Sequence, residues 1–133
     1  MDFISIRVIT EDPKRLTGFY EQVTGLKATW YTDDFAELVT RSCTLAIAHR
    51  RTMEMFAAGA ARPGDNHSVI IELRVDDVDA EYRRIVHFIG KAVQEPTTMP
   101  WGNRSLLFRD PDGNLVNYFT PVTPQAIKKF DRR

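Results

Sequence analysis

The sequence predicts an α+β fold built from two tandem βαβββ modules. The main observation is a repeat: Asp12 and Asp77 each start a helical pattern that follows a β-rich run, and Gly25 and Gly90 end those patterns. The offsets agree, since 77 − 12 = 65 and 90 − 25 = 65. A second observation is a β-hairpin whose turn is written out at residues 110–114, between two apolar runs. Two unrelated segments rarely share a register in this way, so we infer an internal duplication.

The first module is predicted to begin with a strand from Phe3 to Ile9, which is rich in β-branched residues. Asp12 followed by Pro13 matches a helix N-cap with proline in the first turn, so a helix is expected to run to about Thr24. Its apolar residues recur three and four positions apart, which predicts one buried stripe. These residues are Leu16, Phe19, Tyr20 and Val23.

The remaining elements follow the same order in both copies. Three short strands complete the first module, at Lys27 to Thr32, Phe35 to Thr40 and Cys43 to His49. The second module has a strand from Val69 to Val75, a helix from Asp77 to Gly90, and strands at about Ala92 to Thr98, Ser105 to Arg109 and Leu115 to Pro121. Helix formers between the copies, Thr52 to Ala61, and a short run from Gln125 to Phe130 are further helix candidates.

At 133 residues the chain fits one compact unit or two very small ones, and 43% hydrophobic content suffices for a core. We interpret it as one domain, residues 1–133. We divide it into module 1 (3–49), a linker (50–67), module 2 (68–121) and a C-terminal tail (122–133). Lys plus Arg and Asp plus Glu both number 18, which disfavours nucleic acid or an anionic membrane as a partner. The apolar runs are too short to span a membrane, and the acidic start lacks a basic leader region, so we expect a cytoplasmic protein.

Three parts of the chain carry a family resemblance: Asp12-Pro13 through Gly25-Leu26, Val75 to Ala80, and the tract from Trp101 to Phe119. Together they resemble the vicinal oxygen chelate superfamily, which contains glyoxalases, bleomycin resistance proteins and extradiol dioxygenases. The resemblance covers roughly Phe3 to Pro121. It implies curved mixed sheets around a cleft, with modules that pair within one chain or between chains, and therefore a homodimer.

Metal-dependent members of this superfamily hold a divalent ion with histidine and glutamate from the first and last strands of each module. Carried over to this chain, the histidine positions fall on Ser5 and Ile70 and one glutamate position on Asn117. The fourth lies within Thr44 to Ala48, which contains no carboxylate or imidazole. Since none of these residues is a convincing ligand, we expect no metal and no other cofactor.

Other side chains could line the cleft. Alternation puts Ser5 and Arg7 on one strand face, and Ile70 and Glu72 on one face of the repeat strand. Arg7 and Glu72 are repeat mates that could meet. They could form a polar anchor for a ligand, Glu72 could act as a general base, or the two could form a structural ion pair.

Three further candidates lie in the second module. Trp101 offers a flat surface for stacking on a planar ligand. Arg104 could bind an anionic group or lie on the outer face of its strand, and Asn117 could hydrogen-bond a ligand or be a structural amide.

Three functions compete. We favour a metal-free small-molecule-binding protein of the glyoxalase/bleomycin resistance type, which takes a planar or apolar organic ligand in a cleft. The alternative is a lyase, isomerase or dioxygenase-like enzyme of the same superfamily, metal-dependent or using Glu72 as base. A structural or regulatory partner of another protein would leave no mark in the sequence that identifies it.

Overall fold

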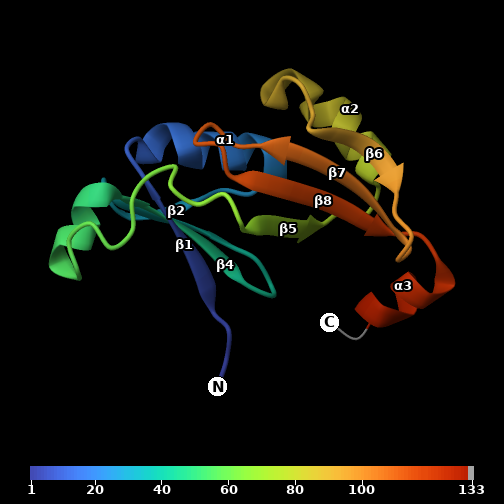
Figure 1. Ribbon diagram of the computed structural model, residues 1–133, viewed down its shortest axis with the longest axis horizontal. Coiled ribbons are helices and arrows are strands. Elements are labelled where there is room, and N and C mark those ends of the chain that lie inside the picture. Colours follow the sequence, from blue (N-terminus) through green and yellow to red (C-terminus); the bar gives the residue numbers. More distant parts are fainter. Residues whose placement is uncertain (132–133) are drawn as a thin grey trace. The chain divides into compact units, whose positions relative to one another are not determined.

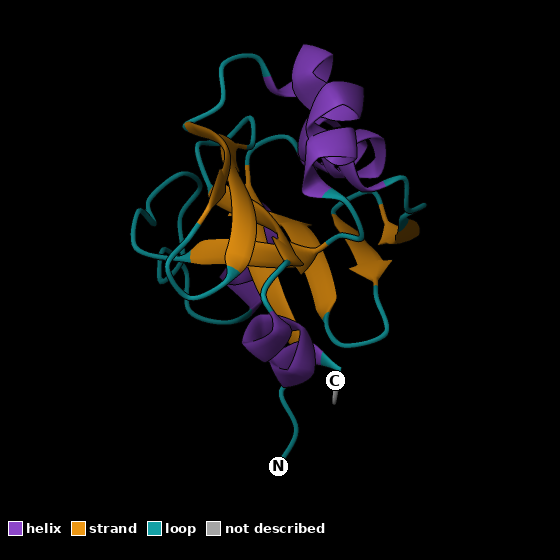
Figure 2. Cartoon of the chain, turned by 90° about the vertical axis from the view of Figure 1, so that its right-hand side faces the viewer, coloured by secondary structure: helices purple, strands orange, loops and turns teal. Residues whose placement is uncertain are grey.

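The computed structural model describes residues 1–131 and contains two compact units. Unit 1 comprises Met1–His67 with Pro111–Gly113, and unit 2 comprises Ser68–Asp110 with the described residues from Asn114 onward. Each unit combines helices with strands, as the sequence predicts for an α+β fold (Figure 2). Within residues 1–131, no helix is long and apolar enough to cross a membrane.

Unit 1 is a four-stranded mixed sheet with one main helix (Figure 1). Its elements are β1 (Ser5–Thr10), α1 (Pro13–Thr24), β2 (Thr29–Thr32), β3 (Phe35–Val39), β4 (Thr44–His49) and the 3-10 helix η1 (Arg50–Met55). The strand order is β1-β4-β3-β2, with β1 and β4 parallel and the other pairs antiparallel.

Unit 2 repeats this plan. Its elements are β5 (Ile70–Arg74), α2 (Val78–Ile89), β6 (Gln94–Thr98), β7 (Asn103–Arg109), β8 (Leu115–Pro121) and α3 (Pro124–Phe130). The strand order is β5-β8-β7-β6, again with one parallel pair, β5 and β8. The duplication inferred from the 65-residue offset is therefore a duplication of topology.

Local sequence accounts for the main helices. The side chain of Asp12 accepts a hydrogen bond from the amide of Arg15, and that of Asp77 accepts one from Ala80, so both aspartates satisfy free amides of a first helical turn. Gly25 ends α1 in the left-handed conformation, with φ of 72°, which costs glycine little. The predicted stripe of α1 is buried: Leu16, Phe19, Tyr20 and Val23.

Each sheet has one face covered by its helix and one face open. In sheet 1, Ala36, Leu38 and Ile47 are almost completely buried on the side that α1 covers. In sheet 2, Leu106, Phe108, Val116 and Tyr118 are equally buried on the α2 side. Because strand side chains alternate, the residues between them project from the opposite face. Arg7, Glu72 and Asn117 lie on these opposite faces.

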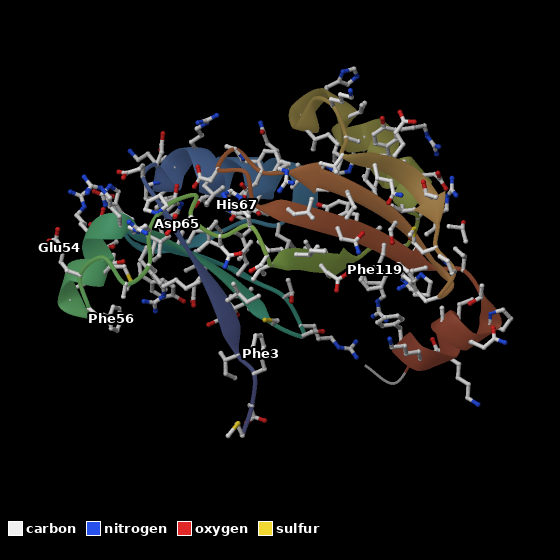
Figure 3. The ribbon with its side chains drawn as sticks, in the orientation of Figure 1. Phe3, Glu54, Phe56, Asp65, His67 and Phe119 are labelled. Atoms are coloured by element: carbon white, nitrogen blue, oxygen red, sulfur yellow. The ribbon has the colours of Figure 1, made fainter. Side chains whose placement is uncertain are left out.

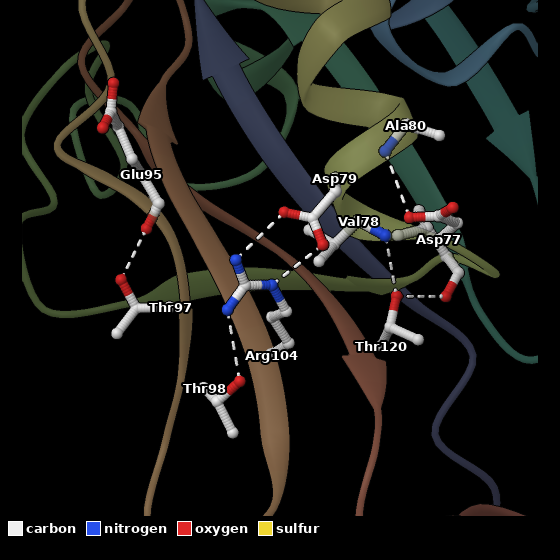
Figure 4. A network of polar contacts seen from close by, with 10 residues as sticks. Asp77, Val78, Asp79, Ala80, Glu95, Thr97, Thr98, Arg104 and Thr120 are labelled. Carbon is white, nitrogen blue, oxygen red and sulfur yellow. Dashed lines mark hydrogen bonds and ion pairs between the residues drawn. The ribbon is translucent and has the colours of Figure 1, made fainter.

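Arg104 fastens α2 to its sheet (Figure 4). Its Nε and Nη2 donate to the two carboxylate oxygens of Asp79, at 2.9 and 3.1 Å, and its Nη1 donates to Thr98 at 3.2 Å. Nearby, the hydroxyl of Thr120 accepts a hydrogen bond from the amide of Val78 in the first turn of α2. The ion pair and this cap hold the N-terminus of α2 on β7 and β8.

The linker differs from its expected structure. Helix formers from Thr52 to Ala61 predicted a helix, but the chain forms only the short η1 and then turns. The ring Nδ1 of His49 accepts a hydrogen bond from the amide of Arg51 and starts this 3-10 helix. Gly59 then adopts a φ of 76°, which is incompatible with a continuing helix.

The Arg104–Asp79 pair yields a stability prediction. In a double-mutant cycle of Arg104→Gln and Asp79→Asn, each single variant should lower the free energy of unfolding at pH 7, and the double variant should lose less than their sum. Arg104 holds the pKa of Asp79 below its ordinary value of 3.8. The stabilisation from the Arg104–Asp79 ion pair is therefore present above pH 3.8, and it is lost as the pH falls through the lower pKa that Asp79 has in the folded protein.

Urea titration at pH 7, and at a pH far enough below 3.8 to protonate Asp79 in the folded protein, measures this coupling. Arg41→Gln, which changes an exposed arginine in the turn before β4, is the charge-matched control and should leave stability unchanged. A coupling that is zero at pH 7, or that persists after acidification, would contradict the structural role of Arg104.

Candidate functional site

Asn117 lies at the centre of the candidate site in unit 2. It sits on β8, on the open face of sheet 2, with Glu72 of β5 on one side and Leu107 of β7 on the other in direct register. Asn117 is only 8% exposed, whereas Glu72 is exposed. The amide Nδ2 of Asn117 donates a hydrogen bond to Oε2 of Glu72 at 2.8 Å. Asn117 and Glu72, which the sequence proposed separately, are thus neighbours in one polar pair.

The other amide atom of Asn117 has no partner. Its Oδ1 is buried, and none of the residues 1–131 donates a hydrogen bond to it. Rotating the amide by 180° would aim Oδ1 at the Glu72 carboxylate, which has no proton to donate when ionised, so the observed orientation is the favourable one. A buried acceptor without a donor costs free energy. A donor that arrives with a ligand would recover it.

Apolar side chains surround this polar pair. Ile70 on β5, 46% exposed, shares the open face with Glu72, while Leu115 and Phe119 flank Asn117 along β8. Phe119 contacts the ring of Phe130 in α3, with centroids 5.1 Å apart, and its side chain is labelled in Figure 3. The guanidinium of Arg74, on the same face, also donates to the carbonyl oxygen of Phe130 at 2.9 Å. The helix α3 therefore closes one end of this face.

The open face of unit 1 carries Arg7. Its guanidinium carbon lies 5.0 Å from the ring centroid of Phe35 on β3 and 5.4 Å from that of Phe56, which follows η1. The ring of Tyr31 packs against the ring of Phe35, with their centroids 5.7 Å apart. Tyr31 also hydrogen-bonds Glu37, and that bond to a carboxylate raises the pKa of the Tyr31 hydroxyl. The result is an exposed cation set among aromatic rings.

The superfamily's metal positions can be tested against the strand register. Arg7 pairs with Ala46 as Glu72 pairs with Asn117, and since 7 + 65 = 72, the position left open within Thr44 to Ala48 is Ala46. Unit 1 thus supplies Ser5 and Ala46, and unit 2 supplies Ile70 and Asn117. Ala46 and Ile70 have no donor atom in their side chains. The hydroxyl of Ser5 and the amide of Asn117 do not form a donor set for a catalytic divalent ion.

Clusters elsewhere do not replace this set. Among residues 1–131, no group of three or more His, Cys, Asp or Glu side chains could hold a metal ion. The chemistry of the donors, rather than their geometry, is what fails to fit the superfamily's metal.

Two further sequence candidates lie away from Asn117. Arg104 is on the face of sheet 2 that α2 covers, where Asp79 binds it, so we leave it out of the candidate site. Trp101 is 65% exposed in the turn before β7. The stretch from Asn103 to Leu107, the neighbour of Asn117, spans about 13 Å of extended strand. A small ligand bound at Asn117 would not stack on Trp101 from that distance.

Arg7 and Glu72 belong to different units, so their direct pairing stays a prediction, as does the use of Glu72 as a base. Within its own unit, Arg7 contacts two aromatic rings, and Glu72 accepts a hydrogen bond from Asn117.

Sequence reasoning missed Phe35 and Phe56 as partners of Arg7. Phe35 reaches Arg7 only through the order β1-β4-β3, which a single sequence does not reveal. The period-two pattern of Phe35 and Glu37 was the one available signal, because it places both side chains on the same strand face.

Comparison with known proteins agrees with this topology. The family model described as Glyoxalase/Bleomycin resistance protein/Dioxygenase superfamily matches residues 3–118. The uncharacterized protein YraH of Bacillus subtilis (strain 168) is 26% identical over 125 residues, which cover 90% of this chain and 98% of YraH.

Solved structures of the same superfamily share the fold. A glyoxalase/bleomycin resistance protein/dioxygenase family enzyme from Burkholderia phytofirmans PsJN has a TM-score of 0.81 at 16% identity, covering 92% of this chain and all of that one. A glyoxalase-related enzyme from Fulvimarina pelagi has a TM-score of 0.76 at 17% identity and covers 94% of each chain. From the repeated βαβββ topology and the match over residues 3–118, the chain belongs to the glyoxalase/bleomycin resistance protein/dioxygenase superfamily.

Proposed function

We propose that this chain is a metal-free small-molecule-binding protein, with Asn117 and Glu72 as the polar anchor of its ligand. The observation that carries the proposal is the buried Oδ1 of Asn117, which lacks a donor although the Nδ2 of the same amide is held by Glu72. The amide stands where metal-dependent members of the superfamily have a carboxylate. A neutral acceptor at that place suits a ligand that brings its own hydrogen-bond donor.

The surroundings define the ligand further. Ile70, Leu107 and Leu115 offer apolar surface next to the Asn117–Glu72 pair, so most of the affinity should come from burial of a planar or apolar body. Both anchor residues present oxygens as acceptors, so the polar end of the ligand should be a hydroxyl or an N–H group. We propose such an organic molecule as the partner of this chain.

The metal-free proposal predicts the composition of the purified protein. Protein purified without chelator should contain far less than one equivalent of zinc, iron, nickel or manganese, because Ser5, Ala46, Ile70 and Asn117 provide no ligand set. Elemental analysis measures this, and ligand binding should be the same before and after treatment with EDTA. Stoichiometric metal that leaves on chelation together with binding would refute the proposal.

Asn117→Leu separates a binding role from a structural one. Leucine has the same number and branching of side-chain heavy atoms as asparagine and no buried acceptor, so the free energy of unfolding should stay within about 1 kcal/mol of wild type. Binding of 2-naphthol should weaken about five- to tenfold, while binding of 2-methoxynaphthalene, which has no donor, should change little. Titration calorimetry measures both affinities.

Asn103→Leu is the matched control for this experiment. Asn103 lies on the same face at the far end of β7 and also has a buried Oδ1 without a partner among the described residues, so its replacement should leave 2-naphthol binding unchanged. If Asn117→Leu unfolded the protein and left the affinity of the remaining folded fraction intact, Asn117 would be a structural amide.

We also propose that the chain forms a homodimer in the cytoplasm, as the resemblance to the superfamily implies for assembly. Exposed apolar residues support the assembly. Phe3 and Ile4, just before β1, are 74% and 67% exposed, and Phe3 is labelled in Figure 3. Val39 is 59% exposed, and the register Ser5–Thr44–Val39 places it at the same end of the sheet. A second copy that covered this end would remove these side chains from water.

The homodimer proposal is checked by light scattering. The mass in solution at micromolar concentration should be twice the chain mass of 15.3 kDa. Phe3→Ser should shift the equilibrium toward monomer, because it removes an exposed ring from the proposed contact. Phe88→Ser, which changes a half-exposed ring on α2, is the control and should leave the mass unchanged. A monomeric wild-type protein would contradict the proposal.

A further inference from the structure

We propose that Arg7, Phe35 and Phe56 form a subsite for the carboxylate of an aromatic or otherwise apolar monoanion. This inference rests on the proposed function, because it specifies the chemistry of a ligand for the same protein. It starts from the guanidinium of Arg7, which lies against two phenyl rings, at 5.0 and 5.4 Å from their centroids.

Within unit 1, Arg7 differs from the arginines nearby in having no anionic partner. Arg50 pairs with Glu11 and Arg51 with Asp34, both at 2.8 Å. The described residues of unit 1 supply Arg7 with ring contacts and with neither an ion pair nor a side-chain hydrogen bond. A ring contact is not an ion pair, so the N–H donors of the Arg7 guanidinium have no carboxylate partner within unit 1. These donors form a fork that matches a carboxylate.

The sheet determines where this fork stands. Arg7 is opposite Ala46 on β4, and Phe35 is opposite Ala48 on the other side of the same strand. The side chain of Arg7 must therefore cross β4 diagonally to reach Phe35, because β1 and β3 flank β4 and lie roughly 10 Å apart. The methyl side chains of Ala46 and Ala48 leave room for this crossing, and both are buried beneath it. The two ring contacts therefore orient the side chain of Arg7 across β4.

Exposed aromatic surface next to the cation indicates an apolar body for the anion. Phe56 is 67% exposed and Tyr31, which packs on Phe35, is 60% exposed. Such exposed rings beside an unpaired arginine can cover an aromatic or aliphatic group while the guanidinium binds its carboxylate. An inorganic anion would leave these rings in water.

Glu37 limits the charge that the subsite accepts. It lies on the same face as Arg7, on the other side of Ala46, and accepts the hydrogen bond of Tyr31. With one cation and one carboxylate so close, the local charge is about zero before the ligand binds. A monoanion bound to Arg7 meets less repulsion there than a phosphate dianion would. The geometry therefore favours a carboxylate over a phosphate ester.

Three probes with one ring system test this inference: 2-naphthoate, its neutral analogue 2-naphthamide, and 2-naphthyl phosphate. Titration calorimetry at low salt should show 2-naphthoate binding about tenfold more tightly than 2-naphthamide, with the phosphate no tighter than the carboxylate. The advantage of the carboxylate should shrink when salt is added, because Arg7 is exposed.

Variants assign the effect to its residues. Arg7→Gln should reduce the affinity for 2-naphthoate to that of 2-naphthamide and leave the amide unaffected, whereas Phe56→Ala should weaken both probes several-fold. Arg41→Gln removes the same charge from an exposed turn without flanking rings and should change neither. Circular dichroism checks that each variant is folded.

The inference fails if 2-naphthoate binds wild type no more tightly than 2-naphthamide, if it does not bind at millimolar concentration, or if Arg7→Gln leaves its affinity unchanged. Failure of the proposed function is a separate result, because it would appear as unchanged 2-naphthol binding in Asn117→Leu. A protein that loses 2-naphthol with Asn117→Leu but ignores Arg7→Gln keeps its binding function and has no carboxylate subsite at Arg7.

Discussion

The parallel pairing of the first and last strands in each module is the constraint on which the rest of the structure depends. It sets Arg7 opposite Ala46 in one unit and Glu72 opposite Asn117 in the other. Because the helix of each module covers one face of its sheet, this pairing also decides which side chains stay on the open face. The candidate anchors are in place because strand register puts them there, and a shift of one residue would bury all of them under a helix.

The metal-free function that we propose rests on side chains of the open faces. By the resemblance to metal-dependent members, the ligand positions of this chain fall on Ser5, Ala46, Ile70 and Asn117. One of these residues is coupled to its neighbour, since Asn117 donates to Glu72 on the adjacent strand. The amide thus has one half satisfied within the protein and the other half buried without a donor. That asymmetry supports the binding role that we propose for Asn117.

Arg104 and Arg7 illustrate how similar residues come to different uses. Both are strand arginines, but Arg104 is on the helix-covered side, where the carboxylate of Asp79 binds it in a bidentate pair. Arg7 is on the open side and meets rings instead of a carboxylate. The strand face therefore decides whether a guanidinium serves to fasten a helix or remains available to an anion.

The sequence by itself determined most of the element boundaries. Caps such as Asp12 and Asp77 and the turn glycine Gly113, with φ of 87°, act through bonds and dihedral angles within a few residues, and β8 is found where it was predicted, at Leu115–Pro121. The repeat made the order of elements readable as well. The helix predicted from the helix formers of residues 52–61 was wrong, because helix propensity without an amphipathic stripe produced only the 3-10 helix η1.

The tertiary structure alone decided which candidates meet. The Asn117–Glu72 bond joins residues 45 positions apart, and Arg7 reaches Phe35 across an intervening strand. Such contacts depend on strand order and pairing register, which arise when distant segments bury their apolar faces together and which no local pattern encodes. For the same reason the sequence showed that Arg104 and Asn117 were polar residues in strands, while only the folded sheet showed that one lies under a helix and the other faces outward.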